Sequence, residues 1–133
     1  MKLILPLEIY LPRKTREDKK IVMNLNIYRN LHTMVMDGAK KEMKRHVELA
    51  LDQAEGQEIG KAPYRFTYTI FPTTGRAFDL GNVCAAVQKF ADDALTELGL
   101  IKDDNYKIVR EINYRFGSID KENPRAELTI EGI

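Results

Sequence analysis

Two groups of carboxylates in the sequence carry the chemistry of a divalent-metal site. Asp79 stands immediately before a run of residues with helical apolar spacing, and Asp103 and Asp104 follow that run. Carboxylate oxygens are the hard ligands that Mg²⁺ prefers, and a bound Mg²⁺ can activate water for attack on a phosphodiester. Each group also has a structural interpretation, because Asp79 suits a helix N-cap and Asp103-Asp104-Asn105 suits a turn. From spacing alone, the structural interpretation is the stronger one.

Basic residues form a second feature, because they are concentrated at the start of the chain. The formal net charge of the 133 residues is only +1. Residues 1–45, however, hold 11 Lys and Arg against 5 Asp and Glu, a net +6, whereas residues 46–133 hold 10 against 15, a net −5. Such a basic segment could neutralise DNA phosphates without reading base sequence, or could simply be solvated surface. The candidate phosphate contacts are Arg13, Lys14, Arg16, Lys19, Lys20, Arg29, Lys40, Lys41, Lys44, Arg45 and Arg76.

The apolar spacing predicts the elements that must position these groups. Period-2 alternation of apolar and polar side chains predicts strands, and apolar residues spaced by threes and fours predict helices. In chain order the predicted elements are a strand at 2–11, a helix at 25–54, a strand at 64–70, a helix at 80–98, and strands near 108–116 and 126–130. Residues 13–20 are typical of an exposed charged loop. Turn residues in 117–124 favour an antiparallel hairpin of the last two strands.

The order β-α-β-α-β-β predicts an α/β (α+β) fold, a single domain over residues 1–133 with a mixed β-sheet and two main helices. Asn24 and Asp79 are the expected helix N-caps, and Gly99 is the expected stop of the second helix. The one cysteine, Cys84, excludes an intramolecular disulfide and a Cys-based zinc cluster. No apolar run reaches the roughly 20 residues of a membrane helix, and no segment has the pattern of a secretory signal. We therefore expect a cytoplasmic protein with no membrane partner.

One stretch of the sequence resembles a known family. Arg76-Ala77-Phe78-Asp79-Leu80-Gly81-Asn82 is followed by Lys89, by Asp93-Ala94-Leu95, by Gly99 and by the pair Asp103-Asp104. This succession resembles the core of the RusA-like Holliday junction resolvases, which typically show Arg-Asp-x-Asp-Asn, a lysine, Asp-Ala-Leu, a glycine and a paired Asp-Asp. The resemblance covers about residues 76–105, and the expected order of elements is also similar to that of the family.

The resemblance implies a function and a set of site residues. Members of the family are small homodimeric endonucleases, often encoded by phages or prophages, that depend on Mg²⁺ and cut four-way DNA junctions in recombination and repair. The resemblance implies that Asp79, Asp103 and Asp104 hold Mg²⁺, for which Mn²⁺ could substitute, and that Asp104 is the better ligand of the pair. It further implies that Lys89 assists at the phosphate. The implied partners are branched DNA and a second copy of the chain, in the cytoplasm of a bacterial host.

Two departures from the family pattern leave alternatives open. Gly81 stands where the family usually has its second catalytic Asp, so one anionic ligand is missing unless Asp92, Glu111 or Asp120 replaces it. Lys89 lies four residues later than the family's lysine, about one helical turn, which keeps it near the same face of the helix. The main alternative is a resolvase-like protein that has lost catalysis and binds junctions or proteins. A more distant one is an unrelated α/β module that binds a host protein through its acidic half.

Overall fold

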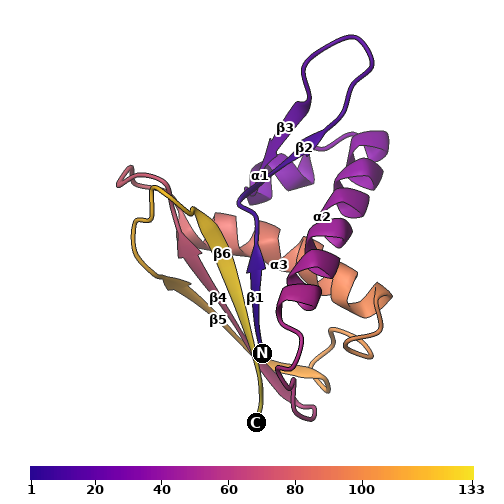
Figure 1. Ribbon diagram of the computed structural model, residues 1–133, viewed down its shortest axis with the longest axis vertical. Helices are drawn as coiled ribbons and strands as arrows, with labels where there is room; N and C mark the ends of the chain where they lie inside the picture. Colours follow the sequence, from indigo (N-terminus) through magenta and orange to yellow (C-terminus); the bar gives the residue numbers. More distant parts are fainter.

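The computed structural model describes the whole chain, residues 1–133, as three helices and six strands in two sheets (Figure 1). The elements are β1 (Lys2–Leu5), β2 (Glu8–Leu11), β3 (Lys19–Val22), α1 (Leu25–Arg29), α2 (Thr33–Gln53), β4 (Tyr64–Phe71), α3 (Leu80–Glu97), β5 (Val109–Phe116) and β6 (Arg125–Gly132). The larger sheet has the strand order β1-β6-β4-β5, and β2 and β3 form a separate two-stranded sheet. The predicted α/β (α+β) fold with a mixed sheet is confirmed. None of the helices has the length and apolar character needed to cross a membrane.

The four-stranded sheet buries one of its faces. β4 lies parallel to β5 on one side and antiparallel to β6 on the other, and β1 is antiparallel to β6. Alternation along β4 buries Tyr64, Phe66, Tyr68 and Ile70, whereas the residues between them are only partly buried. Helix α3 packs against β4 and β5, and α2 packs against α3 and β1. The core therefore lies between one face of the sheet and these two helices.

Helix α3 connects the parallel strands β4 and β5 and is strongly specified by its sequence. Asp79 caps its first turn, and Gly99, at φ 78°, follows its last. The observed bounds, Leu80–Glu97, differ by one residue from those predicted. Because β4 and β5 run in the same direction, α3 must return along the length of the sheet between them. The end of β4 and the start of α3 thus lie at one end of this β-α-β unit, and the end of α3 and the start of β5 lie at the other.

A β-hairpin made of β2 and β3 projects from this body, at the top of Figure 1. It rests on α2 through Leu11 at the end of β2. A Cβ added at Gly38 of α2 would lie 3.4 Å from Cδ1 of Leu11. This is an ordinary contact distance, so the side chain of Leu11 packs directly on the middle of α2.

Two of the predicted strand assignments are wrong. The strand predicted at 2–11 is two strands in different sheets, because Pro6-Leu7 separates β1 from β2. The last two strands do not form a hairpin with each other, because β4 lies between β5 and β6. β6 pairs with β4, which lies far from it in the sequence. Long-range packing decides this pairing, and the turn residues between β5 and β6 do not indicate it.

The N-terminal basic region also differs from prediction. The end of the predicted loop 13–20 belongs to β3, since Lys19 and Lys20 pair with Leu11 and Tyr10 across the hairpin. The helix predicted at 25–54 is interrupted at residues 30–32, so that α1 and α2 are separate. Asn24 caps α1 as expected, and the side chain of His32 caps α2 by accepting a hydrogen bond from the N–H of Met34.

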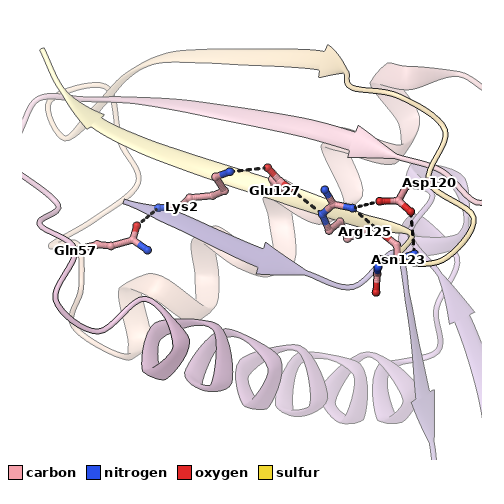
Figure 2. A network of polar contacts seen from close by, with 6 residues as sticks. All are labelled: Lys2, Gln57, Asp120, Asn123, Arg125 and Glu127. Atoms are coloured by element: carbon pink, nitrogen blue, oxygen red, sulfur yellow. Dashed lines mark hydrogen bonds and ion pairs between the residues drawn. The ribbon is translucent and has the colours of Figure 1, made fainter.

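On the open face of the sheet, a polar network ties the chain between β5 and β6 to the strands (Figure 2). Arg125 pairs with Asp120 at 2.8 Å and with Glu127 at 2.7 Å, and Glu127 also pairs with Lys2 of β1 at 3.3 Å. The guanidinium of Arg125 also lies over the ring of Phe71, 4.1 Å from its centroid. The network fixes the β5–β6 connection against β6.

Candidate functional site

Asp79 lies at the exposed N-terminus of α3. Its Oδ1 accepts a hydrogen bond from the backbone N–H of Asn82 at 3.2 Å, which confirms the N-cap interpretation. Its Oδ2 has no hydrogen-bond partner in the chain. A Cβ added at Gly81 would lie 3.4 Å from Asp79 Oδ1, an ordinary contact distance. The position that departs from the family pattern therefore has room for a side-chain Cβ beside Asp79.

Asp103 and Asp104 lie in the exposed turn between α3 and β5. The two carboxylate oxygens of Asp103 accept hydrogen bonds from the N–H of Asp104 at 2.7 Å and from the amide of Asn105 at 2.9 Å. These donors lower the pKa of Asp103. The pKa of Asp104 is raised, first by its partial burial and then by its interaction with Asp103. The turn interpretation of this pair is thus also confirmed.

The three predicted metal ligands do not meet within one chain. Helix α3 has 18 residues and is therefore about 27 Å long, with Asp79 before its first residue and the Asp103-Asp104 pair beyond its last. No group of three or more His, Cys, Asp or Glu side chains in the structure is placed to hold a metal ion. The expectation that the sheet would gather Asp79 and Asp104 is corrected by the parallel pairing of β4 and β5, which puts the two ends of α3 at opposite ends of the sheet. One chain alone does not provide the Mg²⁺ site that the resemblance implies.

A buried polar cluster lies on the inner side of α3. Asp92 is only 3% exposed, and its Oδ1 accepts a hydrogen bond from the hydroxyl of Tyr68 on β4. On the same helix one turn earlier, Oε1 of Gln88 accepts a hydrogen bond from the hydroxyl of Tyr114 on β5 at 2.5 Å. The rings of Tyr68 and Tyr114 meet edge to face, with centroids 6.2 Å apart. The cluster connects the helix to both parallel strands.

Asp92 is the carboxylate with the most perturbed pKa in the structure. Burial raises its pKa from 3.8 to about 6, and the charges of Asp104 and Asp93 add to this effect, whereas the hydrogen bonds from Tyr68 and Gln88 oppose it. Asp92 therefore lies within electrostatic reach of Asp104 and far from Asp79. The sequence pattern contained a signal for its burial, because Asp92 lies three residues before the buried Leu95, on the apolar side of the helix.

Lys89 is exposed on α3, on the side that faces α1. Its Nζ lies 5.8 Å from the ring centroid of Tyr28, a cation–π contact. It lies ten residues after Asp79, about 15 Å along the helix axis. It forms no ion pair with Asp93, which instead approaches Lys40 of α2 at 4.0 Å. Within one chain, Lys89 therefore does not lie beside the carboxylate of Asp79.

The two remaining carboxylates considered as replacement ligands are neutralised by arginines. Glu111 pairs with Arg65 at 2.5 Å, and Asp120 pairs with Arg125 at 2.8 Å. Cys84 is completely buried, and its burial raises the pKa of the thiol to about 12, so it is an inert core residue. None of these three side chains adds a free metal ligand to the Asp103-Asp104 pair.

The structure does bring two predicted basic segments together. A groove of about 610 Å³ lies between the β2-β3 hairpin and α2. Its basic side chains come from both: Arg13 and Lys19 from the hairpin, and Lys41 and Arg45 from the helix. Glu42 is the only acidic residue that lines it, and it pairs with Arg45 at 2.6 Å, which lowers the pKa of Glu42. The groove therefore carries a net positive charge.

The other predicted DNA contacts divide into two sets. Lys20, Lys40 and Lys44 form ion pairs with Glu8, Asp93 and Glu97, so their charges are partly compensated. The remaining candidates, which form no ion pair in the chain, are Lys14, Arg16, Arg29 and Arg76. Lys14 and Arg16 lie in the exposed loop at the tip of the hairpin, next to the groove, whereas Arg76 lies close to Asp79 at the start of α3.

Comparisons with known proteins add no assignment. No protein-family model matches the sequence, and no curated protein matches it significantly.

Proposed function

We propose that this protein binds branched DNA through the groove between its hairpin and α2, and that in a dimer it is a Mg²⁺-dependent endonuclease of four-way junctions. The observation that carries the proposal is the convergence of Arg13, Lys19, Lys41 and Arg45 on one groove. Arg13 and Arg45 are 32 positions apart in the sequence, yet they line the same groove. A groove that carries a net positive charge attracts the DNA backbone.

The geometry of the groove favours a backbone contact over a base-reading contact. One wall is a two-stranded ribbon and the other is a helix of 21 residues, and the loop of residues 12–18 extends the ribbon beyond the helix (Figure 1). The polar side chains that line the groove are Lys and Arg together with Glu42, without the Asn and Gln that pair with base edges. Recognition by charge and shape suits a junction, whose arms differ from linear duplex in geometry and not in chemistry.

The cleavage part of the proposal rests on the resemblance of residues 76–105 to the RusA-like resolvases. Asp79, Lys89, Asp103 and Asp104 remain the proposed catalytic residues. Because one chain does not gather them, cleavage requires a second copy to complete the site. A single protomer should bind DNA without cutting it.

The second candidate is a resolvase-like protein that binds junctions without cleaving them. Gly81 favours it, because a family aspartate is missing there. Both candidate functions use the DNA-binding groove. They differ only in whether the acidic residues catalyse cleavage.

The test compares a synthetic four-way junction with a linear duplex of the same arm sequence. We expect tighter binding to the junction, with an affinity that falls steeply as the salt concentration rises. With Mg²⁺ or Mn²⁺ present, the nuclease proposal predicts paired nicks in opposed strands. Tight binding without nicks would favour the second candidate, and the absence of any salt-sensitive DNA binding would reject both.

A further inference from the structure

The groove between the β2-β3 hairpin and α2 has an apolar end and a basic end. The apolar lining comes from the end of β2 and the first turns of α2, and consists of Leu11, Pro12, Met34, Val35 and Gly38. Lys41 and Arg45 line the groove about one and two turns after Gly38. Figure 1 shows the hairpin beside this first part of α2. Apolar surface and positive charge therefore follow one another within about 17 Å along the helix axis, from Met34 to Arg45.

The apolar end is in contact with solvent. Met34 is 78% exposed, the largest exposed fraction of any large apolar side chain in the protein. Pro12 is also exposed, whereas Leu11 and Val35 are half-buried and pack against the core. A methionine side chain is flexible and adapts to the shape of what it contacts. Apolar side chains that remain exposed within a groove are available to a ligand.

Gly38 leaves space at this end of the groove. It lies in the interior of a helix of 21 residues, where glycine costs about 1 kcal/mol relative to alanine. The only side chain within 4 Å of a Cβ built at Gly38 is that of Leu11, at 3.4 Å. Gly38 and Leu11 both line the groove, so a longer side chain at position 38 would occupy groove space.

Cations adjoin the apolar end from both walls. Lys19 lies directly across the hairpin from Leu11, and Lys41 lies about one turn after Gly38. Neither lysine forms an ion pair in the chain. Arg13 donates a hydrogen bond from its Nε to the backbone carbonyl of its own loop at 2.8 Å, which holds the guanidinium on the hairpin. A ligand seated at the apolar end would thus have positive charge on both sides.

Fully paired DNA cannot use the apolar end. The bases of a duplex are paired and stacked inside it, and its outer surface carries the phosphates. The groove of about 610 Å³ has the size of a site for one small organic molecule, which is about 300–1,000 Å³. An unpaired nucleotide has this size, and it combines an apolar base face with anionic phosphates. Methionine, leucine and proline are among the side chains that proteins place against unstacked bases.

The charge beyond the groove favours a continuous polyanion over a ligand with one anionic group. Lys14 and Arg16 extend the positive charge into the exposed loop at the tip of the hairpin, past the apolar end. Neither forms an ion pair. A nucleic-acid strand presents a phosphate at every nucleotide, so it can contact the groove and the loop together.

We propose that the apolar end of the groove binds an unpaired nucleotide at the branch point of the DNA, with the base against Met34 and Leu11 and the flanking phosphates at Lys19 and Lys41. The assignment rests on the proposed function, because it concerns the same groove. It names the substrate class as branched DNA with unpaired nucleotides at the branch. The paired arms contribute only contacts to their phosphates.

Abasic nucleotides separate the base contact from the phosphate contacts. Two branched DNAs carry the same unpaired nucleotides at the branch, and in one of them these nucleotides lack their bases. Binding is measured without divalent metal, so that cleavage does not intervene. We expect the wild type to bind the intact DNA at least about 5-fold more tightly than the abasic DNA, the lower end of what a stacked base contributes. The salt dependence should be the same for both DNAs, because the phosphate contacts do not change.

Two variants test the protein side of this contact. Met34→Ser removes the exposed apolar side chain, and Gly38→Leu fills the apolar end without changing the charge. Each should reduce the preference for the intact DNA to about 2-fold or less and leave the affinity for the abasic DNA unchanged. Leu49→Ser is the matched control, because Leu49 is 46% exposed on the same helix but lies outside the groove. It should keep the wild-type preference, and circular dichroism shows whether each variant folds.

The outcomes distinguish the base contact from DNA binding as such. If both DNAs bind with the same affinity, or if the preference survives in folded Met34→Ser and Gly38→Leu, the base contact is overturned while the proposed function stands. If neither DNA binds, the proposed function fails and the base contact fails with it. Displacement of the DNA by an acidic amphipathic peptide at a lower concentration than by single-stranded DNA would assign the apolar end to a protein partner and overturn the base contact.

Discussion

The hydroxyl of Tyr68 donates a hydrogen bond to the carboxylate of Asp92 in the core between β4 and α3. Burial raises the pKa of Asp92 from 3.8 to about 6, so the folded protein binds this proton more tightly than the unfolded chain does. The stability that the protonated group contributes is therefore fully present below about pH 4 and is lost as the pH rises through about 6.

Asp92→Asn should stabilise the protein at neutral pH. The amide oxygen can still accept the hydrogen bond from Tyr68, and the cost of a buried charge disappears. A difference of about two pKa units corresponds to an upper limit of about 3 kcal/mol, so we expect a gain of about 1–3 kcal/mol in the free energy of unfolding at pH 8. Urea unfolding at pH 4 and pH 8 measures it. The gain should nearly vanish at pH 4.

The exposed neighbour provides the control for this prediction. Asp93→Asn removes the same charge one residue later and should change stability by less than about 0.5 kcal/mol at either pH. A destabilised Asp92→Asn protein at pH 8 would mean that the carboxylate is needed in its ionised form, for example to hold a cation together with Asp104.

Asp79→Ala should lower the free energy of unfolding by about 1 kcal/mol, because the first turn of α3 loses its cap. Asp79→Asn keeps the acceptor for the N–H of Asn82 and should be nearly as stable as the wild type. If the wild type cleaves junctions, the Asn variant should lose cleavage while remaining folded. Equal destabilisation by Ala and Asn, measured by urea unfolding, would show that capping is not the structural role of this side chain.

Gly81→Asp should increase junction cleavage with Mn²⁺ if the missing aspartate limits the enzyme. The backbone at Gly81 is helical with no positive φ, and the added Cβ has room beside Asp79, so folding should be preserved. We expect an increase of at least about 10-fold, since changes even to the groups around metal ligands alter affinity by this much. Gly81→Asn has the same shape without the charge and should give no increase. Equal rates for the two variants would argue that position 81 does not act through an anionic ligand.

Helix α3 and strand β4 could be predicted from the sequence because their signals are local. The cap at Asp79, the apolar spacing and the stop at Gly99 all lie within the helix and its ends, and β4 alternates cleanly from Tyr64 to Ile70. The breaks at Pro6 and Asn30 were missed because the apolar pattern continues across them. At these two positions one element ends and another begins, although the spacing of the apolar residues stays the same.

The arrangement of the candidate site could not be predicted in the same way. Whether Asp79 and Asp104 meet depends on β4 and β5 being parallel neighbours, and this pairing is decided by long-range packing. The basic groove depends on the close approach of Leu11 to Gly38, a contact between residues in different elements. The residue types indicate which side chains are candidates for metal or phosphate contacts. Where these side chains lie relative to one another depends on the tertiary structure, which places Asp79 and Asp104 at opposite ends of α3 and brings the basic residues of the hairpin and α2 to one groove.

The binding of a four-way junction by a groove variant tests the central claim most directly. Lys19→Gln combined with Lys41→Gln removes two groove cations that form no ion pairs, whereas Lys102→Gln combined with Lys121→Gln removes two exposed cations elsewhere. We predict that the groove variant binds more weakly and that the slope of log affinity against log salt becomes shallower by about 2, with no such change in the control variant. Equal losses in the two variants, or none in either, would contradict the assignment of this groove to DNA.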